Sequence, residues 1–308
     1  MSVLIIYIHV NAKAFHILIY GKRIQNILGR LELIRTEMLN DLNNENIIQR
    51  TESFLLKLDY GYTILMMMFP SISLLTNLFT DYFSTTETVH LPFQIYIPWD
   101  MNEFWPYIYG MLFTTLIVET ACIYYTSFTI LLFTVSFELS AILQVIQAKL
   151  EINGLLDRDT YRQHAHAVRI IQDWNDLYSG QLYLEILISS LQPCGFGYTL
   201  VKTVKQNNPD VLDLIYKSFI AVSAPYIVCA CGQEVSNQME KLHDSSYIGP
   251  WYNQSPKHRR DLLIMKTVMV SPLSFCFRRS VSFNNACFST VAQGIYTYFT
   301  MITNIETS

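Results

Sequence analysis

The chain has 308 residues, of which 51% are hydrophobic and only 15% are charged. An average soluble domain is nearer one quarter charged, so this composition argues against an ordinary soluble domain. The apolar residues fall in blocks, which is typical of a protein that crosses a membrane several times. The formal net charge of −4 comes without a basic arm or stripe, so nothing indicates nucleic acid as a partner.

Six apolar blocks are long enough for membrane helices, which need about 20 residues each. In chain order they are residues 2–20, 58–80, 107–135, 180–201, 212–231 and 280–303. The connecting segments 137–178 and 233–279 are more polar and still carry helical patterns. The sequence therefore predicts one all-α domain, a polytopic transmembrane bundle with six visible spans and helical extensions beyond the membrane.

Several of these blocks contain ionisable residues. The first block carries His9 and Lys13, the third carries Glu119, and Glu185 lies near the start of the fourth. A lone carboxylate in a membrane is costly and usually faces protein or water. For Glu119, hydrogen bonds from nearby Tyr or Thr hydroxyls are the simpler expectation, and a proton relay is the alternative.

The last block, residues 280–303, contains no charged side chain but is not uniformly apolar. Helical spacing places one set of polar residues on a single face: Ser282, Asn285, Ser289, Gln293, Tyr296, Thr300 and Thr303. The opposite face is apolar: Phe288, Val291, Ile295, Phe299 and Ile302. Taken alone, such a helix either hydrogen-bonds to neighbouring helices or lines water, as in a channel.

The positive charges alternate between loops. The counts of Lys and Arg are six in 21–57, none in 81–106, four in 137–178, three in 202–217, five in 233–266 and none after Arg279. Loops rich in these residues stay cytoplasmic, so the pattern predicts an extracellular C-terminus. Six spans then require an extracellular N-terminus as well, and we expect a further span upstream with a cytosolic N-terminus.

No catalytic or metal-binding constellation is present in the sequence. There is no Gly-x-Ser-x-Gly motif, no P-loop and no His/Glu metal-binding motif, so we expect neither an enzyme nor a cofactor. The run from Pro193 through Gly195 to Gly197 predicts a break in the fourth helix. It does not predict a phosphate-binding loop, because no strand precedes it.

Several short motifs resemble insect odorant receptors, in which they recur in this order: Gly232-Gln-Glu-Val-Ser-Asn, Pro250-Trp-Tyr, Arg259-Arg-Asp-Leu-Leu, Ser282-Phe and Tyr296-Thr-Tyr-Phe. The loop Leu91-Pro-Phe with Trp99 also fits that family. Two features depart from it. We expect that the given sequence lacks the first transmembrane helix of the family, and Arg278-Arg279 stands where the family usually has small or apolar residues.

This resemblance implies a subunit of a heterotetrameric cation channel, formed with a shared odorant receptor co-receptor in the cell membrane of sensory dendrites. The last helix of each subunit lines the pore, which implies the pore residues Ser289, Gln293, Ile295, Tyr296 and Thr300, with Ile295 or Tyr296 at the gate. Segments 137–178 and 233–279 would form the cytoplasmic anchor between subunits. The polar face of the last block then favours the channel interpretation.

The resemblance also implies that a small volatile odorant binds among the helices, in the outer half of the lipid membrane. A mostly apolar pocket with one or two polar groups would hold such a ligand. Our candidates are Ile72, Thr76, Phe113, Ile117, Phe219 and Ser223. Two alternatives stay open, a gustatory receptor channel and a polytopic transporter, although the internal repeat usual in transporters is not visible.

Overall fold

The computed structural model describes the chain except for residues 1, 40–41, 84–96, 100–102, 154–157, 206–210, 249–250, 270–272, 279 and 308. The described residues form helices α1 (Ser2–Leu39), α2 (Leu42–Phe83), α3 (Phe104–Asn153), α4 (Arg158–Lys205), α5 (Val211–Ile248), α6 (Pro256–Met269) and α7 (Asn285–Thr307), the 3-10 turn η1 (Trp251–Asn253), and strands β1 (Cys276–Phe277) and β2 (Val281–Ser282). The two strands form a small antiparallel hairpin. The predicted all-α bundle is therefore confirmed.

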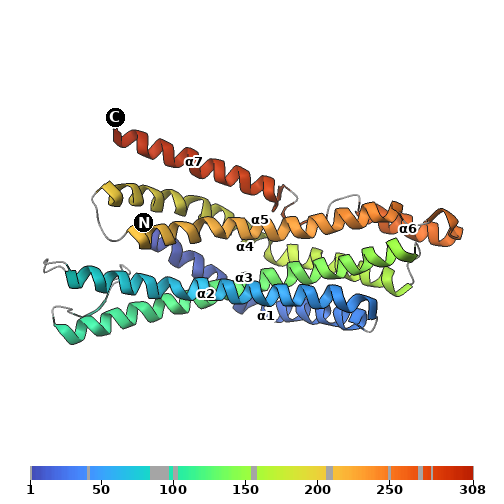
Figure 1. Ribbon diagram of the computed structural model, residues 1–308, viewed down its shortest axis with the longest axis horizontal. Helices are drawn as coiled ribbons and strands as arrows, with labels where there is room; N and C mark the ends of the chain where they lie inside the picture. The colour runs from blue at the N-terminus through green and yellow to red at the C-terminus, as the bar shows by residue number, and fades with distance from the viewer. Residues whose placement is uncertain are drawn as a thin grey trace.

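The long helices run side by side along one axis (Figure 1). Helix α3 has 50 residues, and at 1.5 Å per residue it is about 75 Å long, more than twice the roughly 30 Å of a hydrocarbon core. By length and composition, three helical stretches of the described chain are apolar enough to cross a membrane: Glu45–Thr76, Trp105–Glu151 and Leu214–Ile248. Each long helix thus has room for a span and several further turns.

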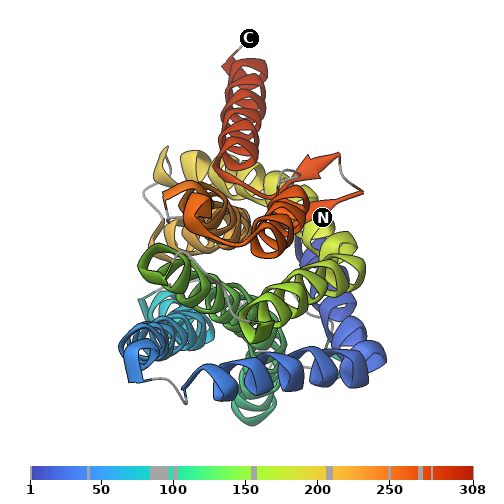
Figure 2. The same ribbon diagram turned by 90° about the vertical axis from the view of Figure 1, so that its right-hand side faces the viewer.

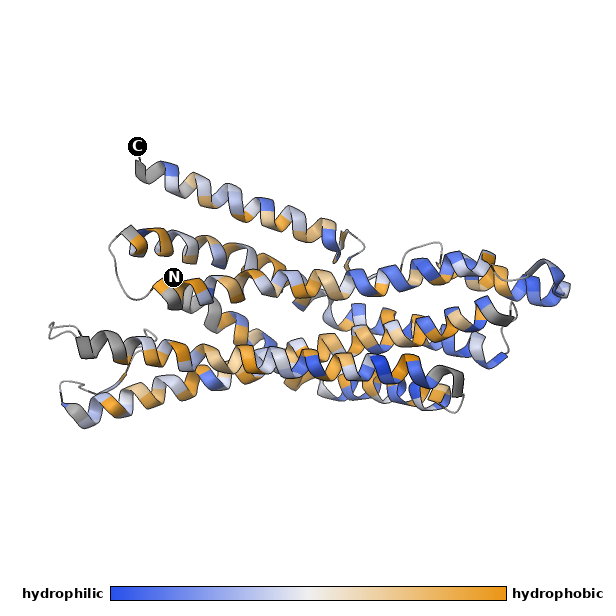
Figure 3. Ribbon diagram, viewed as in Figure 1, coloured by the Kyte–Doolittle hydropathy of each residue, from blue (hydrophilic) through white to orange (hydrophobic). Residues whose placement is uncertain are grey.

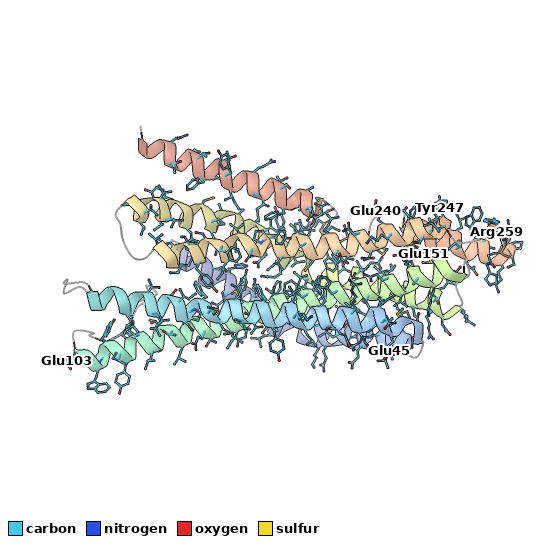
Figure 4. All side chains as sticks on the ribbon, viewed as in Figure 1. Glu45, Glu103, Glu151, Glu240, Tyr247 and Arg259 are labelled. Carbon is cyan, nitrogen blue, oxygen red and sulfur yellow. The ribbon has the colours of Figure 1, made fainter. Side chains whose placement is uncertain are left out.

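The two ends of the bundle differ in character. At the end that holds α6, the chain is more hydrophilic, whereas the opposite half is richer in apolar residues (Figure 3). Glu45, Glu151, Glu240 and Arg259 lie toward the α6 end, and Glu103 marks the other (Figure 4). At the α6 end, the Ser245 hydroxyl donates to Glu151 Oε1 at 2.7 Å and connects α5 to α3.

The core is continuous through the α6 end. On α3 the fully buried positions 135, 139, 143 and 146 belong to it, and α4 and α5 complete it. Large apolar side chains face outward in the apolar half, among them Leu75, Tyr109, Leu116, Leu191 and Phe219, and also beside α6, among them Ile248 and Leu263. A hydrophobic core suits the half that water surrounds, and outward-facing apolar side chains suit lipid.

Two expectations about helix boundaries are wrong. Helix α4 runs unbroken through Pro193, Gly195 and Gly197, because a single proline removes only one backbone donor and the surrounding turns keep their hydrogen bonds. The last helix begins at Asn285, not near Ser280. The residues before it turn back through the β1–β2 hairpin, so Ser282 belongs to a strand and not to the polar face of the helix.

Candidate pore helix and its supports

Helix α7 begins directly after the hairpin, where its first backbone N–H groups need partners. The Cys287 N–H donates to Asn284 Oδ1 at 2.9 Å, so Asn284 acts as an N-cap. The Asn285 N–H donates to Gln233 Oε1 on α5 at 3.1 Å. A side chain of α5 therefore completes the start of α7.

Backbone packs on backbone at the same place. A Cβ atom built on Gly232 would lie 2.0 Å from the carbonyl oxygen of Phe283, so no other residue fits at 232 without moving the chain. The Phe283 side chain is fully buried, and its N–H donates to the Phe275 carbonyl at 2.9 Å. Two of the motifs noted in the sequence, at Gly232 and at Ser282-Phe283, thus meet in one joint between α5 and α7.

Helix α4 holds the hairpin from the other side. The Asn175 side chain donates to the Ser274 carbonyl at 2.9 Å and accepts from the Cys276 N–H at 3.2 Å. The rings of Tyr183 and Phe277 are stacked, with centroids 4.5 Å apart and an interplanar angle of 4°. The N-terminal end of α7 is therefore connected to both α4 and α5.

Further along, α7 has lighter support. The Phe299 ring lies 3.2 Å from the position that a Cβ on Gly197 would take. The Cys194 thiol donates to the Ile295 carbonyl at 3.7 Å, and the rings of Phe288 and Tyr226 meet edge to face at 5.3 Å. Both views show α7 at the edge of the bundle, projecting away from α1, α2 and α3 (Figures 1 and 2).

The predicted pore residues divide between two sides of α7. Ser289, Gln293 and Tyr296 are exposed, Tyr296 at 69%. Thr300 is half-buried, and its hydroxyl donates to the Tyr296 carbonyl at 3.0 Å. Ile295 is half-buried on the side of α4. Of the two gate candidates, Tyr296 therefore lies on the open side of this chain.

The predicted odorant residues lie on α2, α3 and α5. The Thr76 hydroxyl donates to the Ile72 carbonyl at 2.6 Å, and the Ser223 hydroxyl donates to the Ile220 carbonyl at 2.8 Å. The other three are exposed to 41%, 36% and 58%: Phe113, Ile117 and Phe219. A cleft of about 250 Å³ lies elsewhere, between α1 and α4, where Arg30 pairs with Asp173 at 2.5 Å.

Side chains of α1, α3 and α4 form a buried ionic cluster that the sequence does not predict. Glu185 Oε2 lies 2.6 Å from Lys13 Nζ and 2.7 Å from His9 Nε2, and the Tyr125 hydroxyl donates to Oε1 at 2.6 Å. Lys13 Nζ also lies 3.3 Å from the centre of the Tyr125 ring, a cation–π contact. The spacing of His9 and Lys13, four residues apart in an apolar block, was the available signal.

Glu119 does not fit the expectation made for it. It is half-buried, and no Tyr or Thr hydroxyl among the residues that the structure describes donates to it. The carboxylate that does accept such a bond is Glu185, in the fourth predicted span. The expectation that a carboxylate in an apolar block finds a hydroxyl partner is therefore met at Glu185 and not at Glu119.

The sequence matches a known family along nearly its whole length. The sequence profile described as "7tm Odorant receptor" covers residues 1–296. The chain is 24% identical to Odorant receptor 85c of Drosophila melanogaster over 226 residues, 69% of this chain and 56% of that protein. It is 25% identical to Odorant receptor 85b of the same species over 186 residues, 57% of this chain and 47% of that one. The chain thus spans about half the length of these relatives.

Solved structures agree in fold. The insect olfactory receptor OR5 from Machilis hrabei superposes with a TM-score of 0.70 at 16% identity, over 98% of this chain and 79% of that one. The same receptor in complex with eugenol gives 0.73 at 14% identity, over 99% and 80%. Identity this low shows a shared fold alone.

Proposed function

The chain belongs to the 7tm Odorant receptor family of multi-pass membrane proteins, and from this premise we propose that it is a subunit of an odorant-gated, non-selective cation channel. The observation that carries the proposal is the exposed polar side of α7, with Ser289, Gln293 and Tyr296. Polar groups are costly against lipid, so this side calls for water or for other subunits.

The proposed assembly places α7 beside the corresponding helices of a shared odorant receptor co-receptor, around a central water-filled path. Ser289, Gln293, Tyr296 and Thr300 would line the path, and Ile295 would pack behind them. Segments 137–178 and 233–279 would supply the cytoplasmic contacts between subunits. Their long helices and buried core give these segments the stiffness that such an anchor requires.

The proposed ligand is a small, volatile, mostly apolar molecule. The eugenol complex of OR5 supports this class, because that receptor has the same fold. Ile72, Thr76, Phe113, Ile117, Phe219 and Ser223 remain our candidates for contacts. Whatever the odorant, it must bind the open state better than the closed one, because equal binding shifts no equilibrium.

The test is expression with and without the co-receptor in a voltage-clamped cell, challenged with a panel of volatile compounds that includes eugenol. We expect at least one volatile to evoke a current that needs both subunits. The current should reverse at once under voltage steps, near the value for a non-selective cation path. A volatile-evoked response carried by a coupled transport cycle, or surface expression without any evoked current across the panel, would contradict the proposal.

A further inference from the structure

We infer that α7 moves as a lever, with the Gly232–Phe283 joint as its fixed pivot and the Gly197–Phe299 contact as a rest that holds it in the closed state. This inference depends on the proposed channel function and names the residues that position its pore helix. The inference rests on the two glycines that contact α7 and the segment before it. Gly232 meets the backbone of Phe283, whereas Gly197 meets the side chain of Phe299.

At the N-terminal base of α7, Gly232 is packed against backbone. The Phe283 carbonyl oxygen occupies the space of a Cβ on Gly232, at 2.0 Å. Backbone cannot leave by changing a rotamer. Gln233 adds its bond to the Asn285 N–H, and Asn175 holds the hairpin that leads into the helix. Separating this joint would break these hydrogen bonds together and uncover the fully buried Phe283 side chain, which packed interiors resist.

In the C-terminal half of α7, the contact with Gly197 is made by the end of a side chain. The Phe299 ring lies 3.2 Å from the Cβ position of Gly197, and that ring can turn or withdraw. Beyond it, the Cys194 thiol makes a weak bond to the Ile295 carbonyl at 3.7 Å. These contacts come from side chains of α4 and α7 that can move, whereas backbone packing at Gly232 holds the base of α7.

The distance of the gate candidate from the pivot has a consequence for gating. From Asn285 to Phe299 the helix extends 14 residues, about 21 Å, so a small rotation about its base displaces the upper half by several ångströms. Tyr296, the gate candidate on the open side, lies in that upper half. The glycines are thus positioning residues: Gly232 fixes where α7 starts, and Gly197 sets how closely α7 rests on α4.

Alanine substitutions separate the two roles, and α4 offers a matched control. Gly195 lies on the same helix as Gly197, and a Cβ there meets nothing within 4 Å. Receptors are expressed with the co-receptor and activated by the most potent volatile of the panel described above. Basal current, the half-maximal concentration (EC50) and surface labelling are measured for each variant.

Gly197→Ala should push α7 away from its rest. We expect a basal current at least twofold above that of wild type and an EC50 at least threefold lower, with normal surface labelling. Gly195→Ala should match wild type. The pair Gly197→Ala/Phe299→Leu removes the crowding and should return both values toward wild type. An unchanged or higher EC50 for Gly197→Ala would overturn the inference, because the contact would then persist or tighten on opening.

The pivot has its own measurement. Gln233→Met keeps the side-chain length and removes the acceptor for the Asn285 N–H, so it is a milder change than Gly232→Ala. Since the joint is the same in both states, Gln233→Met should lower surface labelling and maximal current together while the EC50 stays within twofold. An EC50 shift as large as that of Gly197→Ala would show that the joint itself moves. Loss of volatile-evoked current in the wild type would instead count against the proposed function.

Discussion

Lys13 and Glu185 form an ion pair with 2.6 Å between Nζ and Oε2, and the exposed fractions of their side chains are 0% and 2%. The pair joins α1 to α4, and the Tyr125 hydroxyl brings in α3. Removing one partner from a buried pair leaves the other charge without compensation, which costs about 3–5 kcal/mol. Glu185→Gln should therefore lower the thermal midpoint of the detergent-solubilised receptor and reduce its surface expression.

Two further variants make that result specific. The double change Lys13→Met/Glu185→Gln removes both charges and should recover part of the lost stability. The control is Arg162→Gln, which breaks an exposed pair with Glu37 at 3.3 Å. Exposed pairs contribute about 0–1 kcal/mol, so the control should barely move the midpoint. If Glu185→Gln is as mild as the control, the buried cluster is not a structural tie.

The buried side chain of His164 predicts that the stability of the fold depends on pH. Burial lowers the pKa of this side chain from its ordinary 6.5 to about 4, and it lies outside the predicted spans. Because the folded-state pKa is below the unfolded value, the unfolded chain binds the proton more readily between these limits. Stability is therefore complete above about pH 6.5 and declines as the pH falls toward 4, by about 2 kcal/mol at pH 5.

The measurement is the thermal midpoint in detergent at pH 7.5 and pH 5. His164→Gln should reduce the difference between the two pH values, since the neutral amide does not titrate. His166→Gln, two residues along α4 and half-buried, is the matched control and should leave the difference unchanged. Equal pH dependence in wild type and His164→Gln would contradict the assignment.

The orientation of α7 gives a third prediction. We propose that its C-terminal end is extracellular, because no Lys or Arg follows Arg279 whereas five precede it in 233–266. An epitope tag after the last residue should be labelled on intact cells. A tag inserted at η1, near the basic α6, should be labelled only after permeabilisation. The reverse pattern would invert the proposed topology.

Some of this architecture follows directly from residue patterns. The apolar blocks predict the bundle, and the spacing of Ser289, Gln293 and Tyr296 predicts a shared side of α7, which the exposure of these residues matches. Such features depend on periodicity within one helix, and a sequence displays periodicity directly.

Other features depend on contacts between distant segments. Glu185 lies 176 residues from His9, and no local pattern reveals that the two meet. The hairpin strands have two residues each, too few for an alternation to be visible. Gly232 and Phe283 were noted as parts of separate motifs, but only the packing of α5 against the hairpin shows why both positions are restricted.

The measurement that tests the central claim most directly places a carboxylate on each side of α7 in the receptor expressed with its co-receptor. Gln293 is exposed on the polar side, and Val291 is half-buried in the core contact. A carboxylate that faces the ion path attracts cations. Gln293→Glu should therefore change cation selectivity or block by divalent cations while the volatile still opens the channel. Val291→Glu should abolish surface expression or assembly. If Gln293→Glu and Thr300→Glu both reach the surface and leave selectivity and block unchanged, α7 does not line the pore.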